Sequence, residues 1–307
     1  MPEGDAIFRT ARTLERALAG RTVERFESVL PHLTRIDEDQ AIAGRTVERV
    51  RSAGKHLLLE FSGGLVLRTH MRMNGAWHVY RRGERWRRSR HQMRVAIETD
   101  AFTAVAFNVP VAEFLTAKEM ARAPALQSLG PDLLGEELDV DAAVSRLKAE
   151  GSCEIAEVLL DQRVVSGIGN VYKSEVCFLC GVSPFARMSE LSDDQLRALV
   201  ATARRLLQAN VHAAATGQIV TRRTLRSMTG RAEAGEGVWV YGRAGKPCRR
   251  CGAIILRDKR GEQARSTYWC PQCARGSGPK GPRPHTSGDA DPAAPENPSP
   301  RARSPHR

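Results

Sequence analysis

Two pairs of cysteines near the C-terminal end constrain the fold more than any other feature of the chain. Cys248 and Cys251 form one Cys-x-x-Cys pair, and Cys270 and Cys273 form a second pair after 18 intervening residues. Each pair can present two thiolates to one ion, and two pairs together complete a tetrahedral site. The spacing therefore predicts one structural zinc ion, and the residues between the pairs predict a β-hairpin that turns near Gly261.

The remaining cysteine usage argues against a disulfide framework. The chain has seven cysteines, an odd number, and acidic and basic residues from Glu3 onward interrupt any signal-peptide core. No apolar run approaches the ~18–20 residues that a membrane-spanning helix needs. We therefore expect a cytoplasmic, reducing location without a membrane partner, and association with the nucleoid if the source is bacterial.

The chain carries a strong positive charge. It has 47 Lys and Arg residues against 35 Asp and Glu residues, a formal net charge of +12 at pH 7. This balance favours a polyanionic partner, with nucleic acid ahead of an anionic membrane surface. Residues 81–90 contain six arginines around Trp86. We interpret this segment as a solvated hairpin loop, with phosphate contact as the second interpretation.

The first residues place a candidate nucleophile at the start of the chain. Aminopeptidases remove an initiator Met when a small residue follows, so the mature chain is expected to begin at Pro2, with Glu3 beside it. An α-amino group has a pKa of about 7.7–8.0, against about 10.4 for Lys, so part of it is neutral at pH 7. A neutral secondary amine can attack a sugar carbon and form an iminium intermediate. The alternative is that Met-Pro is an ordinary start site.

The N-terminal part combines one helix with many short strands. Residues 5–19 have apolar side chains at helical spacing, and Gly20 ends this helix. The strand-like segments that follow have a spacing typical of a sandwich or barrel. They are residues 23–29, 47–51, 56–61, 65–71, 77–80, 93–98 and 102–107.

The pattern becomes helical after Leu129-Gly130-Pro131-Asp132, which marks an interdomain linker. Helical segments are expected at residues 141–149, 153–161, 170–179 and 192–214. The turn Gly167-Ile168-Gly169-Asn170 lets the backbone approach a ligand, and amides at the start of the next helix can hold an anion. Asn170 can cap that helix or contact phosphate. Lys173, three residues further on, adds a basic group.

Five motifs occur in one order along the chain: Pro2-Glu3-Gly4, Gly54-Lys55-His56-Leu57, Leu129 to Leu133, Gly167 to Asn170 and the four-cysteine hairpin. Together they resemble the formamidopyrimidine-DNA glycosylase / endonuclease VIII family of base-excision repair enzymes, over residues 2 to about 274. The resemblance implies an α+β fold. An N-terminal β-sandwich flanked by helices precedes a helix-two-turns-helix domain with a zinc-ribbon-like β-hairpin, and damaged DNA lies between the two domains.

The resemblance also implies domain bounds. We expect an N-terminal catalytic β-sandwich domain at 2–125, a linker at 126–150, the helix-two-turns-helix DNA-binding domain at 151–235 and the zinc finger at 236–275. The last part, 276–307, is rich in Pro, Gly, Ser and Arg and is expected to be a disordered tail.

Roles follow for the residues that match the family's motifs. Pro2 is similar to the nucleophile that attacks C1′ of the damaged nucleotide, and Glu3 resembles the general acid/base. Lys55 matches a lysine that reaches toward the phosphate or sugar near the lesion. Asn170 and Arg265 match residues that bind phosphate. These roles agree with the need to hold a duplex while a base is flipped, which costs a few kcal/mol.

A residue must also fill the space that the flipped nucleotide leaves. His70 to Gly75 follow a strand and end in a glycine turn, which presents Arg72 and Met73 as candidates for an intercalating wedge. The alternative is that Met73 is an ordinary core residue.

Two departures from the family pattern bear on the substrate. The branch that excises 8-oxoguanine carries an Arg-Phe wedge after a sandwich strand, and residues 107–111 lack it. This favours the endonuclease VIII branch, which prefers oxidised pyrimidines. The family's usual Glu is replaced by Ala6, and Asp5 is out of register by one, so the proton network around Pro2 is expected to be altered.

The sequence thus predicts a monomeric, bifunctional DNA glycosylase/AP lyase without a small-molecule cofactor. Pro2 displaces an oxidised base and forms a Schiff base, and β,δ-elimination nicks the strand. One alternative is a non-catalytic or AP-lyase-only protein that binds damaged DNA. Another is a zinc-ribbon module of transcription or translation, which would leave the amine terminus and the glycine-rich turn unexplained.

Overall fold

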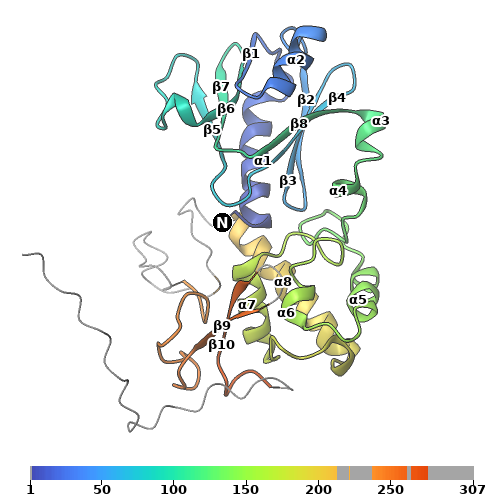
Figure 1. The fold of residues 1–307 in the computed structure, drawn as a ribbon, viewed down its shortest axis with the longest axis vertical. Helices are drawn as coiled ribbons and strands as arrows, with labels where there is room; N and C mark the ends of the chain where they lie inside the picture. Colours follow the sequence, from blue (N-terminus) through green and yellow to red (C-terminus); the bar gives the residue numbers. More distant parts are fainter. Residues whose placement is uncertain (1, 213–220, 222–236, 261–263, 276–307) are drawn as a thin grey trace, which may run out of the picture.

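The computed structural model describes residues 2–212, 221, 237–260 and 264–275, and it forms an N-terminal and a C-terminal body (Figure 1). The N-terminal body contains α1, α2 and strands β1 to β8, and the C-terminal body contains α5 to α8 and the β9–β10 hairpin. Among the helices that the structure describes, none combines the length and apolar character that a bilayer crossing requires.

Helix α1 (Gly4–Leu18) joins the two bodies. Its buried residues Ile7, Leu14 and Leu18 recur at helical spacing, and they pack against both sheets of the N-terminal body. The helix ends before Gly20, whose φ of 76° is a left-handed conformation that glycine adopts without strain. The N-terminal end of α1 points toward the C-terminal body (Figure 1). The first residues of the chain therefore lie at the boundary between the bodies.

Two four-stranded antiparallel sheets form a sandwich, which confirms the predicted fold class. The strand orders are β1-β6-β7-β5 and β2-β3-β4-β8. The bounds are β1 Arg25–Ser28, β2 Val47–Ala53, β3 His56–Phe61, β4 Leu65–His70, β5 Ala76–Arg81, β6 Met93–Glu98, β7 Phe102–Phe107 and β8 Val111–Thr116. Apolar side chains of both sheets, such as Phe61, Leu67 and Ile97, form one core with the buried face of α1.

Short helices lie at the edges of the sandwich. They are α2 (Pro31–Asp39), the 3-10 helix η1 (Arg90–Gln92), α3 (Ala117–Met120) and α4 (Pro124–Gln127). Helices α3 and α4 follow β8 and lead into the C-terminal body (Figure 1).

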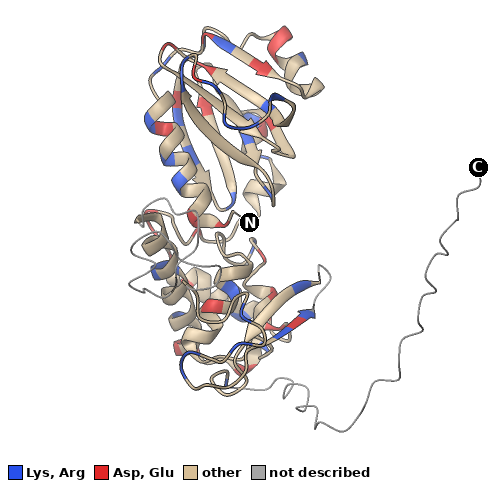
Figure 2. Ribbon diagram, turned by 90° about the vertical axis from the view of Figure 1, so that its left-hand side faces the viewer, with Lys and Arg blue, Asp and Glu red and all other residues tan. Residues whose placement is uncertain are grey.

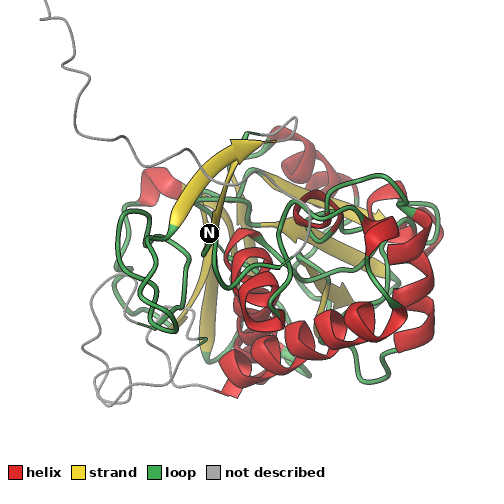
Figure 3. Ribbon diagram, turned by 90° about the horizontal axis from the view of Figure 1, so that it is seen from below, coloured by secondary structure: helices red, strands yellow, loops and turns green. Residues whose placement is uncertain are grey.

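The C-terminal body is a helical cluster with its own core. Its helices are α5 (Val140–Ala149), α6 (Ile155–Val158), α7 (Asn170–Cys180), the 3-10 helix η2 (Met188–Glu190) and α8 (Asp193–His212). Side chains such as Leu147, Tyr172 and Leu207 are fully buried between them. The hairpin of β9 (Leu256–Arg260) and β10 (Arg265–Trp269) packs against α7. Seen from below, the helices gather at one side of this body and the cysteine-bearing loops at the other (Figure 3).

Most predicted elements agree with the structure, but two elements were not predicted and two predicted ranges differ from it. The predicted strands at 56–61, 93–98 and 102–107 coincide with β3, β6 and β7. Strand β8 and helix α2 were not predicted, and the helix expected at 153–161 is wrong beyond the single turn of α6. The range assigned to the linker, 126–150, contains α5, whose buried side chains belong to the C-terminal core. The domain bounds remain a prediction, and the tail at 276–307 lies outside the described residues.

A buried carboxylate connects α7 to the segment that leads into the zinc finger. Glu175, in the middle of α7, is 0% exposed. Its carboxylate accepts hydrogen bonds from the amides of Trp239, Val240 and Tyr241 at 2.8, 2.8 and 2.9 Å, and from the hydroxyl of Thr221. These donors satisfy an acid that would be costly to bury alone. Glu175 therefore fixes residues 239–241 on α7.

We expect Glu175→Ala to destabilise the protein by at least about 3 kcal/mol, because three amides, including the buried amide of Val240, lose their acceptor. Glu175→Gln keeps one acceptor oxygen and should lose less. Chemical denaturation measures both values. The matched control is Glu119→Gln, a change at an exposed capping residue of α3, which should cost no more than about 1 kcal/mol. Equal losses for Glu175→Ala and Glu119→Gln would contradict the role assigned to Glu175.

Candidate functional site

Glu3 lies at the boundary between the two bodies and caps a helix of the other body. It is 0% exposed and precedes the first residue of α1. Its carboxylate accepts the amide of Val171 at 2.8 Å and that of Tyr172 at 3.4 Å, both in the first turn of α7. Burial raises the pKa of Glu3, and the amide of Val171 and the charge of Lys55 oppose that increase. The result is a buried carboxyl group that holds a proton more readily than an exposed one.

Glycines make this close approach feasible. A Cβ on Gly169 would lie 2.3 Å from Cδ of Glu3, and a Cβ on Gly4 would lie 2.8 Å from Cα of Gly167. The amide of Gly4 donates to the carbonyl of Gly167 at 2.9 Å. The Pro2-Glu3-Gly4 start and the Gly167-to-Asn170 turn thus fit together as one contact. Pro2, half-buried, directly precedes it.

Lys55 is held in the turn between β2 and β3. Gly54, with a φ of 55°, donates its amide to Oδ2 of Asp132 at 2.8 Å, and Oδ1 of Asp132 accepts the amide of Leu134. The linker motif therefore attaches the β2–β3 turn to the C-terminal body. Burial lowers the pKa of Lys55 to about 8, the nearby Glu3 opposes the decrease, and Arg265 adds to it. Lys55 thus belongs to the same charged cluster as Glu3.

Two histidines lie beside Lys55. The rings of His56 and His70 meet edge to face at 4.9 Å between centroids. Burial lowers the pKa of His56 to about 3 and that of His70 to about 4, so both are neutral at pH 7. Nδ1 of His70 accepts the amide of Arg72 at 3.1 Å. This hydrogen bond fixes the start of the β4–β5 loop.

The β4–β5 loop presents the candidate wedge residues. Arg72 has a φ of 46°, in the left-handed region, and Met73 is 64% exposed whereas Met71 is buried. Gly75 donates its amide to the carbonyl of Met71 at 2.9 Å and closes the loop. The core interpretation of Met73 is therefore wrong, because its side chain lies on the surface at the tip of a tight turn.

Three residues of α7 hold β10 in place. The side-chain Nδ2 of Asn170 donates to the carbonyl of Ser266 at 2.9 Å, and Nζ of Lys173 donates to Oγ1 of Thr267 at 2.8 Å. Oγ of Ser174 accepts the amide of Tyr268 at 3.4 Å. Asn170 does not cap α7, because Gly169 occupies the N-cap position and Glu3 accepts the free amides. The capping interpretation of Asn170 is thus wrong.

Lys173 and Arg265 are both basic, but Lys173 is buried inside the protein whereas Arg265 is half-buried. Lys173 is 1% exposed, and its ammonium is used within the protein to bind β10. Burial lowers the pKa of Lys173 to about 8, and the charge of Arg265 adds to the decrease. Arg265 is half-buried at the start of β10, close enough to Lys55 to lower its pKa as well. The two bodies thus bring Arg265 and Lys55 close together, whereas Lys173 is buried against β10.

A second acid accompanies Glu3. Asp5 is 0% exposed, and its Oδ2 pairs with Nη2 of Arg9 at 3.2 Å. Burial raises the pKa of Asp5, and the charge of Arg9 opposes that increase. Asp5 in turn contributes to the raised pKa of Glu3. Asp5 is thus a buried acid next to Ala6 in the sequence, and Arg9 is its ion-pair partner.

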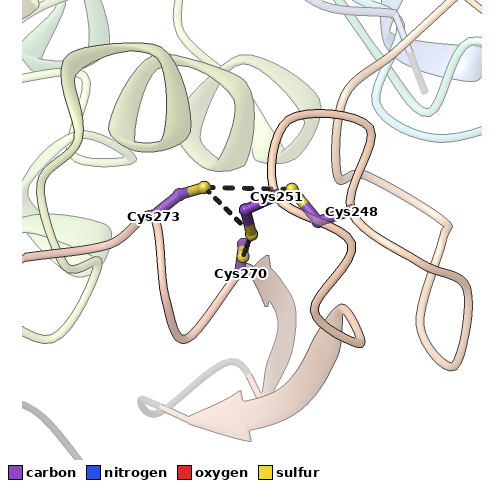
Figure 4. A group of neighbouring side chains, drawn as sticks. All are labelled: Cys248, Cys251, Cys270 and Cys273. Atoms are coloured by element: carbon purple, nitrogen blue, oxygen red, sulfur yellow. Dashed lines mark hydrogen bonds between the residues drawn. The ribbon is translucent and has the colours of Figure 1, made fainter.

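The four cysteines converge as the spacing predicted (Figure 4). Their sulfur atoms all lie within 4.8 Å of one another, with pairs at 3.4 Å (Cys251 and Cys270), 3.5 Å (Cys251 and Cys273) and 3.9 Å (Cys248 and Cys273). Sulfurs bound to one tetrahedral zinc at about 2.3 Å are about 3.8 Å apart, so the arrangement fits that ion. The four thiolates fill a tetrahedral shell, and the site is structural.

Glu175 and Asp132 both accept hydrogen bonds from backbone amides, and neither role was predicted from the sequence. Glu175 lies within an ordinary helical pattern, and its amide partners follow about 65 residues later. Asp132 was interpreted as part of a linker, but it holds the turn that carries Lys55. An acid at a buried position of α7, between Tyr172 and Phe178, was the available signal for Glu175.

Comparison with family models matches three parts of the chain. Residues 1–110 match the formamidopyrimidine-DNA glycosylase N-terminal domain, and residues 129–222 match the formamidopyrimidine-DNA glycosylase H2TH domain. Residues 245–276 match the zinc finger found in FPG and IleRS. The matches follow the order of the motifs and cover both bodies.

Solved structures share the fold. Lactococcus lactis formamidopyrimidine-DNA glycosylase, non-covalently bound to DNA that contains an AP site, has a TM-score of 0.73 at 20% identity, over 90% of this chain and 100% of that chain. The same enzyme in complex with DNA that contains N7-benzyl-Fapy-dG has a TM-score of 0.74 at 21% identity, with the same coverage.

Relatives at higher identity cover nearly the whole chain. The probable endonuclease 8 2 of Streptomyces coelicolor is 42% identical over 91% of this chain and 96% of its own length. The DNA-(apurinic or apyrimidinic site) lyase Nei2 of Mycolicibacterium smegmatis is 38% identical over 90% and 100%, and endonuclease 8 of Escherichia coli is 32% identical over 89% and 99%. The protein therefore belongs to the formamidopyrimidine-DNA glycosylase family, in its endonuclease 8-like branch.

Proposed function

We propose that this protein is a bifunctional DNA glycosylase/AP lyase that removes oxidised bases from DNA. The observation that carries the proposal is the buried carboxyl group of Glu3, which directly follows Pro2 and faces the amides of α7. A carboxyl group with a raised pKa is suited to donate a proton at neutral pH. The names of the relatives, endonuclease 8 and AP lyase, support the same activity.

The reaction uses groups at the chain start. After removal of the initiator Met, the secondary amine of Pro2 attacks C1′ of the damaged nucleotide, and the bond from C1′ to the base breaks. The base leaves with the bonding electrons and takes up the proton that the amine loses. Glu3 supplies a proton to the sugar oxygen as the ring opens, which leaves an iminium between Pro2 and C1′. Loss of the C2′ proton allows β-elimination of the 3′ phosphate, and δ-elimination of the 5′ phosphate follows. Hydrolysis of the iminium then returns the amine.

The remaining residues would hold the DNA. Lys55 and Arg265 meet at the boundary of the bodies and would bind phosphates on either side of the lesion, with Asn170 as a third contact. Arg72 and Met73 would enter the space of the flipped nucleotide. Lys173, buried against β10, would position Arg265 rather than bind DNA itself. We propose that the protein acts as a monomer and needs no small-molecule cofactor.

Oxidised pyrimidines are the proposed substrates. The stretch after β7 offers no exposed aromatic side chain, because Phe107 and Val109 are both 0% exposed and no second Phe follows before β8. This part of the surface therefore lacks the Arg-Phe wedge of the branch that excises 8-oxoguanine.

An N-terminal extension that resists proteolysis should abolish covalent chemistry, because it converts the Pro2 amine into an amide. We expect nicking to fall by on the order of 10³-fold or more, while affinity for an abasic duplex changes little. The assay is borohydride trapping on an abasic duplex and on a thymine-glycol duplex, with mass spectrometry of the adduct. The same extension at the C-terminal end is the matched control.

The two substrates separate the outcomes. An untagged protein trapped through its N-terminal peptide on both duplexes supports the bifunctional enzyme. Trapping on the abasic duplex alone would support the AP-lyase-only alternative. Normal nicking by the N-terminally extended protein would refute the role of Pro2, and tight binding without any adduct would favour the non-catalytic alternative.

DNA affinity should depend on pH through Lys55. Its pKa in the free protein is about 8, and a bound phosphate raises it, so the complex binds more protons than the free protein above pH 8. The affinity for DNA is therefore highest below pH 8 and falls as the pH rises above 8, by up to about tenfold per pH unit. The measurement uses a duplex with a tetrahydrofuran abasic analogue, which forms no iminium.

Lys55→Arg is the matched variant for this titration, because an arginine stays charged over the whole range. Its affinity should stay constant between pH 7 and 10. The Pro2 amine and Lys173 also titrate in this range, but both proteins contain them. The same decrease in Lys55→Arg would therefore assign the effect to one of those groups and contradict the phosphate contact of Lys55.

Removal of the metal should weaken DNA binding without unfolding the N-terminal body. Cys251→Ser leaves three thiolates, so the hairpin that carries Arg265 loses its support. We expect at least a tenfold loss of affinity for all lesions alike, together with loss of bound zinc by elemental analysis. Cys153→Ser, a change at an exposed cysteine outside the cluster, is the control. Full affinity in a zinc-free protein would contradict the structural role of the ion.

A further inference from the structure

The β5–β6 loop is an ordered structure on the outer face of one sheet. We name residues 81–90 the arginine loop, since six of the ten residues are arginines. Trp86 packs edge to face on Phe107, with 5.8 Å between centroids, and beside the buried Tyr80 and Met93. The amide of Arg87 donates to the hydroxyl of Tyr80 at 3.1 Å. Trp86 thus anchors the loop, so the arginines around it are held in defined places.

Some of these arginines are used within the protein. Arg82 pairs with Glu24 at 2.6 Å and with Glu98 at 3.2 Å. Arg90 pairs with Glu27 at 3.4 Å and lies over the ring of Trp86, 4.8 Å from its centroid. These contacts fasten both ends of the loop to the sheet.

Among the described residues, the other four arginines of the loop, Arg81, Arg85, Arg87 and Arg88, have no such ion pair. Arg81 is the last residue of β5, whereas the other three lie around Trp86. Within the described part of the chain, no carboxylate lies within salt-bridge distance of Arg85, Arg87 or Arg88. Arg85 and Arg87 are exposed and Arg88 is half-buried. Burial lowers the pKa of the neighbouring His78, and the charges of Arg88 and Arg87 lower it further. The loop thus carries a local excess of positive charge on an anchored scaffold, which suits a partner with regularly spaced anions.

The position of the loop relates it to the candidate site. It lies on the same side of the molecule as the start of the chain and the β9–β10 hairpin (Figure 1), and Figure 2, which faces that side, shows Lys and Arg there. Strand β5 runs from the β4–β5 loop, with Arg72 and Met73, directly to the arginine loop. Its six residues span roughly 20 Å at about 3.3 Å per residue. A duplex rises about 3.4 Å per base pair, so a duplex that runs along β5 would meet the arginine loop about six base pairs from the wedge residues.

We propose that the duplex runs along β5 and that Arg85, Arg87 and Arg88 form a second phosphate-binding surface, which contacts its backbone about six base pairs from the lesion. This inference rests on the proposed function, because that function supplies the duplex and its position at the boundary of the two bodies. The planar guanidinium fork matches phosphate oxygens, and the contacts carry no sequence information.

The test compares duplexes of two lengths, each with a central tetrahydrofuran abasic analogue. Long duplexes have about 15 base pairs on each side of the lesion, and short ones have about four. The variant is Arg85→Gln, Arg87→Gln and Arg88→Gln combined. Each phosphate contact contributes about −0.9 to the slope of log affinity against log salt. We therefore expect the variant's slope on the long duplex to decrease in magnitude by about 2–3, with at least a tenfold loss of affinity at about 0.15 M salt.

The short duplex should not distinguish the variant from the wild type, because its ends do not reach the arginine loop. A matched control removes three exposed arginines from α1 and β2, with Arg12→Gln, Arg16→Gln and Arg49→Gln, and changes the net charge equally. It should lose less than half as much of the slope. An unchanged slope of the loop variant on the long duplex, or an equal loss on both lengths, would overturn the proposal.

Borohydride trapping on the short abasic duplex separates this inference from the proposed function. The loop variant should form the adduct as the wild type does, because the chemistry lies at Pro2. Absence of an adduct from the wild type itself would overturn the enzymatic function, and the comparison of duplex lengths would still decide whether the arginine loop binds DNA.

Discussion

The contact between Glu3 and the first turn of α7 is the interaction on which the arrangement of the site depends. Amides at the start of a helix have no partner within it, and a buried carboxylate needs donors. In this protein the two needs are met across the boundary of the bodies, by Val171 and Tyr172. The contact has no room for a side chain at residue 169. It therefore sets the angle at which α1 meets the C-terminal body, and with it the position of the chain start.

Helix α7 extends this constraint to the rest of the site. Its first turn binds Glu3, its next turn binds β10 through Lys173 and Ser174, and Glu175 holds residues 239–241. Strand β10 carries Arg265 and leads into Cys270, so the zinc site and the proposed phosphate-binding residue Arg265 share one support. On the N-terminal side, Asp132 attaches the turn with Lys55. Residues far apart in sequence thus meet because they all contact one helix or the linker before it.

Local patterns were sufficient for much of this structure, and non-local contacts account for what they missed. The helical spacing of α1 and the apolar strands β3, β6 and β7 depend on neighbours in sequence, and the cysteine spacing encodes its own ligand geometry. Strand β8 pairs with β4, more than 40 residues earlier, and helix α2 buries only Leu33. The positive charge of Lys173 suggested a contact with DNA, but its ammonium donates a hydrogen bond to the hydroxyl of Thr267 on β10. A single sequence does not reveal such contacts, because neither of the two segments that meet has a pattern that indicates its partner.

The anchoring of Glu3 and Gly4 determines how far the proposed nucleophile can travel. A lysine carries its amine on a flexible stem of four carbons, whereas the amine of Pro2 is one residue, about 3.8 Å between Cα atoms, from a residue that is fully buried and fixed. Its reach is therefore very short. The carbon that it attacks has to be brought to the protein surface, out of the base stack, before any bond can form. In the proposed reaction, the DNA therefore has to make the necessary movement.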